Sequence, residues 1–170
     1  MAVLIVAGMV EMGLLRCHMI LKRRKTTDTK ECRNLRVLNV EGIMGDLSKN
    51  FSKYEFACKC GCGFGTHAGD VSEELLSLLE GIRSEAGGPL RINSGCRCES
   101  YNQSVGGAVH SRHVTGEAAD INVEGGWRRF KVQKAAHLMG AEGVGTAKGF
   151  VHVDCHHGSA DCPRPSAWVY

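Results

Sequence analysis

The stretch AVHSRHVTGEAADINV, residues 108–123, decides how the rest of this sequence is interpreted. His113 and Asp120 are its best candidates for binding a metal ion, and they stand seven residues apart. That spacing is neither the i, i+4 spacing of one helix face nor the CxxC spacing of a cysteine knuckle. The chain must therefore bend to bring the two side chains together, and Gly116 can take backbone conformations that are closed to other residues.

A strand is predicted directly after this bend. From Ala118 onward the side chains alternate, and the period of a strand places the two sets on opposite faces. The core-facing set is Ala119, Ile121 and Val123, and the opposite set is Ala118, Asp120 and Asn122. Asp120 is therefore expected to be a carboxylate on a rigid element.

The segment GFVHVDCHH, residues 149–157, supplies the best third ligand. If this segment pairs as a strand with residues 119–123, His152 lies beside Asp120. Two imidazoles and a carboxylate form a ligand set that Zn²⁺ accepts, and a catalytic zinc keeps one position for water. We therefore predict one zinc ion at His113, Asp120 and His152. The alternative is a salt bridge with two hydrogen-bonded histidines, and the agreement of motif order with strand phase disfavours it.

Taken as one unit, residues 94–121 resemble the zinc D-Ala-D-Ala carboxypeptidase family, which also holds phage endolysin peptidases. The family hallmark SxHxxGxAxD is matched at every fixed position, by Ser111, His113, Gly116, Ala118 and Asp120. An upstream SGxR…N element is matched by Ser94, Gly95, Arg97 and Asn102, and the later FVHVD motif by residues 150–154. The resemblance covers about residues 47–170, with three separated motifs in the right order.

The resemblance implies a peptidase that hydrolyses peptidoglycan peptides, as a D,D-carboxypeptidase or an endopeptidase. It implies a bacterial or phage-encoded chain that is made in the cytoplasm and acts at the cell wall. Arg97 would hold the substrate, because its guanidinium fork suits a carboxylate or an oxyanion. Ser111 would hydrogen-bond either the substrate or the ligand loop.

Two other classes of function remain open. The hedgehog signalling domain is similar to this family and keeps the metal cradle as a receptor-binding protein, so a zinc-stabilised binding module without turnover is the main alternative. In a cysteine-rich structural or redox module, the thiols would be the working groups instead of His113.

The general base is not evident from the sequence. Many members of the family place His, Glu or Asp a few residues before the last ligand, where this chain has Gly149 and Phe150. Asp154 shares the face of His152 and is the best local replacement as a catalytic base. It is equally suited to orienting His152. Weaker options for the base are His110 and Glu117.

Composition is that of an ordinary globular domain, because 43% of the 170 residues are hydrophobic and 23% are charged. A formal net charge of +3 is too mild to indicate a nucleic-acid partner. The one dense basic run, residues 22–25, lies outside the region that carries the motifs. No sequence feature indicates the oligomeric state.

Nine cysteines are many for this length, but the number is odd and several are clustered. We favour a reduced compartment, or clusters that meet each other, over a fully disulfide-bonded chain. Cys58, Cys60 and Cys62 alternate along the chain, so they cannot all bind one ion unless the glycines bend its path. A structural metal shared with Cys96 and Cys98 is an alternative to the favoured interpretation, which is free or pairwise-bonded thiols.

Residues 1–46 are interpreted as a leader and residues 47–170 as the domain. Residues 1–21 are apolar but carry charges, and the basic run follows them instead of preceding them as in a secretory signal. A membrane anchor with charges in its span is costly, so membrane attachment is disfavoured.

The predicted fold class is α+β, with a small antiparallel sheet that carries the zinc site and packs against helices. Apolar residues at helical spacing predict a core helix that opens near Asp70 and ends before Gly87. Helices are also predicted at 99–105 and at 127–139, where Trp127 and Phe130 are expected to pack. The predicted strands, besides those of the site, are a short one at 90–93, a hairpin after 143–145 and an edge strand in 163–170.

Overall fold

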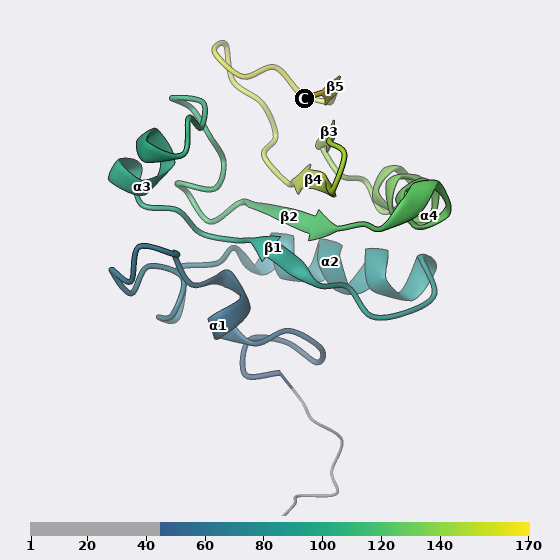
Figure 1. Cartoon of the computed structure of the whole chain (residues 1–170), viewed down its shortest axis with the longest axis horizontal. Helices are drawn as coiled ribbons and strands as arrows, with labels where there is room; N and C mark the ends of the chain where they lie inside the picture. Colours follow the sequence, from purple (N-terminus) through teal and green to yellow (C-terminus); the bar gives the residue numbers. More distant parts are fainter. Residues whose placement is uncertain (1–44) are drawn as a thin grey trace, which may run out of the picture. The chain divides into compact units, whose positions relative to one another are not determined.

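Five strands form one mixed sheet in the order β1-β2-β4-β3-β5 (Figure 1). The computed structural model describes residues 45–170. The strands are β1 (Ile92–Ser94), β2 (Ala118–Asn122), β3 (Gly143–Thr146), β4 (Phe150–Asp154) and β5 (Ser166–Val169). Neighbouring strands are antiparallel except β3 and β5, which are parallel. The predicted α+β class is confirmed. The expectation of an antiparallel sheet fails only at β5, because the chain after β4 crosses to the far side of β3.

The pairing of β2 with β4 places the two motif-bearing strands side by side. Asp120 is directly opposite His152, and Ala118 is directly opposite Asp154. The register predicted from alternation is therefore confirmed. Because a one-residue slip would turn every side chain to the other face, this register fixes which residues face the core.

Four helices accompany the sheet: α1 (Lys53–Phe56), α2 (Glu73–Glu85), α3 (Glu99–Ser104) and α4 (Gly125–Leu138). The predicted core helix is α2, which buries Leu75, Leu79 and Ile82 completely. It begins after Ser72, whose hydroxyl accepts a hydrogen bond from the Leu75 N–H, and not at Asp70 as expected.

The hydrophobic core lies between one face of the sheet and helices α2 and α4. The inward side chains of β2 and β4, namely Ala119, Ile121, Val151 and Val153, are fully buried there. Full burial of a large apolar side chain stabilises a fold by about 1.5–3 kcal/mol. One face of the sheet therefore packs in the hydrophobic core and stabilises the fold. The opposite face carries the polar side chains.

The packing role predicted for Trp127 and Phe130 in α4 is wrong. Their exposed fractions are 71% and 59%, and their rings stack on each other with centroids 6.4 Å apart. The buried face of α4 instead consists of Val132, Ala135 and Ala136. Small residues on that face let α4 lie close to the sheet, which leaves the aromatic residues on the outside.

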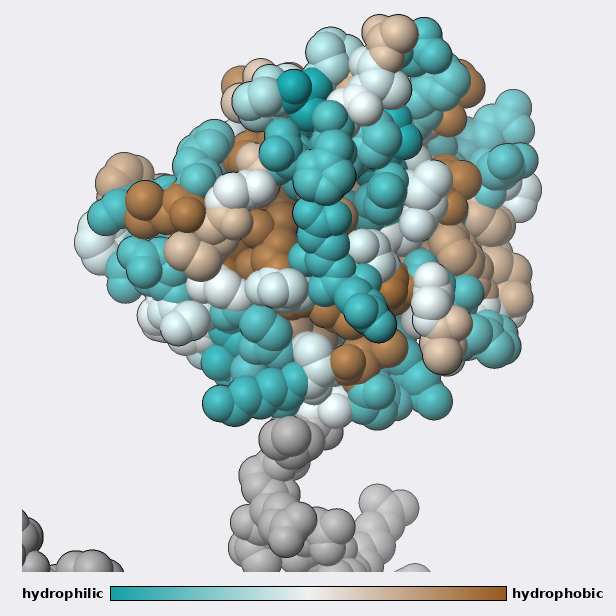
Figure 2. All heavy atoms as spheres, turned by 180° about the vertical axis from the view of Figure 1, so that it is seen from behind, coloured by the Kyte–Doolittle hydropathy of each residue, from teal (hydrophilic) through white to brown (hydrophobic). Residues whose placement is uncertain are grey.

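Apolar side chains are also visible on the face drawn in Figure 2, where brown areas are separated by hydrophilic ones. Scattered apolar surface of this kind is normal for a folded domain. Among residues 45–170, no helix combines the length and the apolar character that crossing a membrane requires. The predictions for the apolar segment 1–21, and for the rest of the leader up to residue 44, lie outside the described residues.

Candidate metal centre

Three buried side chains converge on the polar face of the sheet. His113 comes from the loop before β2, Asp120 from β2 and His152 from β4. The His113 Nε2 atom lies 3.2 Å from Asp120 Oδ1 and 3.2 Å from His152 Nδ1. The third separation, between His152 Nδ1 and Asp120 Oδ1, is 2.9 Å. The structure therefore brings together all three ligands expected from the sequence, and each offers one atom to a common point.

The bend between His113 and Asp120 occurs at Gly116, as predicted. Gly116 has a φ of +72°, and its carbonyl oxygen accepts a hydrogen bond from the Ser72 N–H at 3.0 Å. A Cβ atom at this position would collide with the Asp70 carbonyl oxygen. Only glycine fits both the conformation and the close approach. The same contact ties the ligand loop to the start of α2.

Hydrogen bonds fix which nitrogen of each histidine faces the centre. The His113 Nδ1–H donates to the Gly95 carbonyl oxygen at 2.6 Å, so its Nε2 presents a lone pair. The His152 Nε2 atom lies 3.4 Å from Asp154 Oδ2, and a proton on Nε2, facing this carboxylate, leaves the Nδ1 lone pair toward the centre. With these tautomers, two lone pairs and a carboxylate oxygen point at one another. A cation between them satisfies all three, and the residues therefore fit a bound metal ion.

The ionisation of His113 and Asp120 agrees with that role, whereas at His152 a metal ion would have to displace a proton. Burial lowers the pKa of His113, so its imidazole is neutral at neutral pH. Burial alone would raise the pKa of Asp120, but hydrogen bonds and charge from His113 and His152 hold it well below its usual range. The pKa of His152 is raised, because the carboxylates of Asp120 and Asp154 outweigh its burial.

Arg97 lies directly against one of the ligands. Its Nη2 donates to Asp120 Oδ2, the carboxylate oxygen that does not face the histidines, and its Nε donates to Ser94 Oγ at 2.8 Å. Its backbone N–H donates to the His113 carbonyl oxygen at 2.9 Å. Arg97 thus holds the ligand set from the side, and its predicted contact with substrate stays a prediction.

A cavity of about 410 Å³ opens beside the three ligands. His113, His152 and Arg97 form part of its wall, and Ser111 lines it as well. A second cavity of about 400 Å³ adjoins it, and both are lined by Arg97, Gly106, Gly107 and Tyr170. The centre is therefore accessible to a ligand larger than water, in a hollow of the size typical of small-molecule sites.

Asp154 lies behind His152 and away from the ligand atoms. It is fully buried and accepts two hydrogen bonds from Arg164. The Arg164 Nε donates to Asp154 Oδ1 at 3.0 Å, and Nη2 donates to Oδ2 at 2.6 Å. Burial would raise its pKa, but His152 and Arg164 together lower the pKa to about 2. The carboxylate contacts the ring nitrogen of His152 that does not face the centre. This geometry favours the orienting role over that of a base.

The two weaker candidates for the base differ in their position. His110 is exposed and lines the larger cavity. Glu117 hydrogen-bonds the Thr115 hydroxyl at 2.6 Å and approaches His156 at 3.6 Å, and it is not part of the cavity wall.

The sequence reasoning missed two residues of the site, Arg164 and Trp168. Arg164 pairs with Asp154, and the Trp168 ring lies 5.3 Å from that of His152. The sequence predicted only an edge strand in 163–170, without a role in the site for either residue. Both follow β4 in the chain, and only the crossover to β5 brings them back over the site. An aromatic or basic residue in a C-terminal segment does not by itself indicate that the segment packs against the site.

A second group of potential ligands among the described residues consists of Cys58, Cys60, Cys62 and Cys98. Cys96, which the sequence reasoning included, is buried and points to the Asp70 carbonyl oxygen instead. No disulfide joins any of the seven cysteines between residues 45 and 170.

The buried His/Asp/His centre lies on the polar face of an α+β sheet beside a cavity, an arrangement that can hold a metal ion within reach of a ligand. The family model for Peptidase M15 matches residues 49–154, which is more than half of the 170 residues. The chain therefore belongs to this family of zinc D-Ala-D-Ala carboxypeptidase-like peptidases. All three converging side chains lie inside the matched range, whereas Arg164 lies beyond it. No curated protein matches the chain.

Proposed function

We propose that this chain is a zinc metallopeptidase that hydrolyses amide bonds in peptidoglycan peptides, as a D,D-carboxypeptidase or an endopeptidase. The observation that carries the proposal is the convergence of His113 Nε2, Asp120 Oδ1 and His152 Nδ1 at the wall of an open cavity. Membership of a peptidase family supports peptide hydrolysis. The peptidoglycan substrate, and action at a bacterial cell wall, rest on the sequence resemblance.

His113, Asp120 and His152 would hold the zinc ion. A zinc ion bound by two imidazoles and one carboxylate supplies a water molecule of lowered pKa and polarises an amide carbonyl. The protein's own contribution is orientation. The Gly95 carbonyl fixes the ring of His113 and Asp154 fixes that of His152, while Arg97 holds the free oxygen of Asp120.

The cavity favours a substrate with an anionic group. Its wall includes three arginines, Arg97, Arg112 and Arg164, and one carboxylate, Asp161. Arginine donors bind carboxylates in a defined orientation, and Arg97 uses only two of its five N–H groups on Ser94 and Asp120. We propose that Arg97 receives the terminal carboxylate or the reacting carbonyl of a stem peptide, with Ser111 beside it.

The general base is proposed to be His110 and not Asp154. Asp154 is bound to Arg164 behind His152, which removes its carboxylate from the cavity. His110 lines the cavity, carries an imidazole that can accept a proton, and was a weaker option on sequence grounds.

A non-catalytic binding module of the same fold is the second candidate. The burial of Asp154 favours it, because the one carboxylate that follows the last ligand on its own strand cannot reach the cavity. The two candidates share the metal centre and differ in turnover.

Digestion of purified muropeptides, followed by mass spectrometry of the products, separates the two functions. We expect wild-type protein to release amino acids or split cross-bridges, and His113→Ala to lose this activity. His137→Ala is the matched control, because His137 is exposed on α4. A zinc-loaded wild type that leaves every muropeptide intact would contradict hydrolysis and support the binding module.

A further inference from the structure

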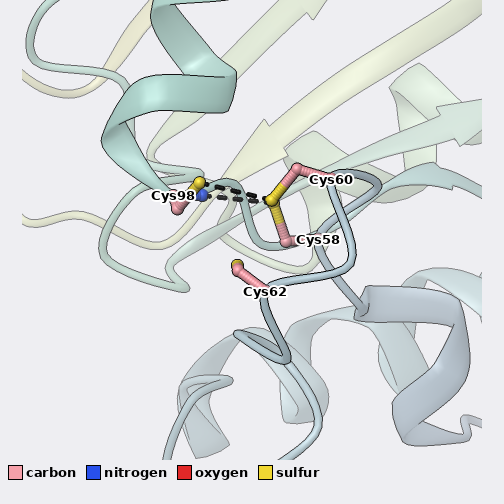
Figure 3. A group of neighbouring side chains, drawn as sticks. All are labelled: Cys58, Cys60, Cys62 and Cys98. Atoms are coloured by element: carbon pink, nitrogen blue, oxygen red, sulfur yellow. Dashed lines mark hydrogen bonds between the residues drawn. The ribbon is translucent and has the colours of Figure 1, made fainter.

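Four cysteines from two distant segments meet at one point of the structure. Cys58, Cys60 and Cys62 lie in the loop after α1, and Cys98 immediately precedes α3 (Figure 3). Their four Sγ atoms all lie within 4.8 Å of one another. This group is separate from the His/Asp/His centre, and none of its members lines the cavity beside that centre.

The three cysteines of the loop come close together because the backbone turns at two glycines. Gly61 and Gly63 have φ values of +81° and +88°, a conformation that side chains other than glycine rarely adopt. The turn is closed by hydrogen bonds from the Cys58 N–H to the Phe64 carbonyl oxygen at 2.7 Å and from the Gly61 N–H to the Cys58 carbonyl oxygen at 3.1 Å. On an extended strand, alternate residues advance by about 6.6 Å, so the turn is what gathers the three thiols.

The sulfur separations fit a metal ion better than disulfides. The distance is 3.3 Å between the Sγ atoms of Cys58 and Cys60, and 3.5 Å between those of Cys60 and Cys98. Four sulfurs around a tetrahedral zinc with bonds of about 2.3 Å lie about 3.8 Å apart. A disulfide would need about 2.0 Å. The observed contacts and the 4.8 Å limit bracket the tetrahedral value.

Polar groups approach two of the four sulfurs. The backbone N–H of Cys98 donates to the Cys58 Sγ at 3.3 Å, and the Ser100 hydroxyl lies 3.2 Å from the Cys98 Sγ. Donors directed at sulfur stabilise the thiolate form, which is the form that binds metals.

We propose that Cys58, Cys60, Cys62 and Cys98 bind a structural metal ion through four thiolates, with zinc as the preferred ion. Four protein ligands close the coordination sphere and leave no position for water or substrate, which is the arrangement of structural zinc sites. This function goes beyond the proposed hydrolysis, because the ion has no part in the chemistry.

The ion would join the loop after α1 to the segment that carries Arg97. Cys98 follows Arg97 directly, and the Cys96 N–H already donates to the Phe56 carbonyl oxygen at 2.9 Å. Metal binding at Cys98, together with this hydrogen bond of Cys96, would therefore hold the backbone on both sides of Arg97. This consequence rests on the function proposed for Arg97, whereas the existence of the site does not.

The test measures metal bound by the full chain, purified under reducing conditions and loaded with Co²⁺. Thiolate ligands give an intense sulfur-to-cobalt absorption in the near ultraviolet, whereas His and Asp ligands do not. We expect this absorption in wild type and in His113→Ala, and its loss in Cys62→Ser. Cys162→Ser is the matched control and should retain it, because Cys162 is outside the group.

A second measurement uses only the wild-type protein, so its result does not depend on whether a variant folds. Alkylation of wild-type thiols, mapped by mass spectrometry of peptides, should show that added zinc protects the four cysteines of the group and leaves Cys162 reactive. Absence of the sulfur-to-cobalt absorption in wild type, or disulfides among the four in the freshly reduced protein, would overturn the proposal. Because His113→Ala keeps the thiolate site, failure of peptide hydrolysis and failure of this site are distinguishable.

Discussion

At the scale of single residues, His152 is the side chain on which most contacts of the centre converge. It faces His113 and Asp120 with one ring nitrogen and Asp154 with the other. If Asp154 orients His152, Asp154→Asn should weaken zinc binding by about 10–100-fold and leave turnover at saturating zinc close to wild type. Competition with a chromophoric chelator measures the first quantity, and Asp161→Asn, an exposed carboxylate of the same cavity, is the control.

The opposite outcome for this variant is equally well defined. A loss of turnover of about 10²–10⁴-fold with unchanged zinc affinity would make Asp154 the base. Thermal denaturation should accompany both measurements, because removing one partner of a buried ion pair can cost about 3–5 kcal/mol.

Arg97 allows a second test at this scale. Arg97→Lys keeps the charge and loses the guanidinium fork, so we expect impaired turnover with zinc content unchanged. The exposed Arg91 provides the matched control, Arg91→Lys, which should leave kinetics unaltered. Equal kinetic constants for the two variants would show that Arg97 has no part in turnover.

At the scale of elements, the bend before β2 depends on one glycine. Gly116→Ala introduces both left-handed strain and a collision with the Asp70 carbonyl oxygen. Gly140→Ala has similar strain, with a φ of +78°, and meets no atom within 4 Å. The control should cost about 1–2 kcal/mol in the free energy of unfolding, and Gly116→Ala should cost more. Urea denaturation of metal-free protein measures both, and equal losses would show that the collision is relieved without cost.

Helix α2 carries a pH-dependent contact with the segment that precedes α1. Glu80 accepts hydrogen bonds from the Ser48 hydroxyl at 2.7 Å and from the Asn50 side chain at 2.6 Å. Burial alone would raise the pKa of Glu80, but these hydrogen bonds lower it. The stabilisation is therefore present above the ordinary glutamate pKa of about 4.3 and is lost as pH falls through the lower folded value.

We therefore expect Glu80→Gln to destabilise the protein at neutral pH and to approach wild type in stability as pH falls below about 4. Glu85→Gln, at the exposed end of the same helix, is the control. Urea denaturation at a series of pH values measures the difference. A deficit for Glu80→Gln that does not change with pH would contradict the assignment to charge.

At the scale of the whole molecule, local periodicity predicted the parts that depend on neighbours in the sequence. Alternation in β2 and β4 was sufficient to place His152 opposite Asp120, because one buried face permits only one register. Helical spacing was sufficient for α2. The ligand triad followed from these two strands and one glycine.

Contacts between segments that are far apart in the sequence could not be predicted. The contact of Arg164 with Asp154 requires the crossover to β5, and the exposure of Trp127 depends on which face of α4 meets the sheet. The gathering of the four cysteines depends on the φ angles of two glycines, which hydrogen bonds to later residues select. None of these has a periodic signal.

The most direct test of the central claim is reconstitution of chelated protein with measured amounts of zinc, with muropeptide hydrolysis as the readout. The account predicts that chelation abolishes hydrolysis, that hydrolysis rises with zinc bound at the His/Asp/His centre, and that Asp120→Ala recovers none at any zinc concentration. Hydrolysis that persists after complete removal of metal, or that returns fully in Asp120→Ala, would contradict it.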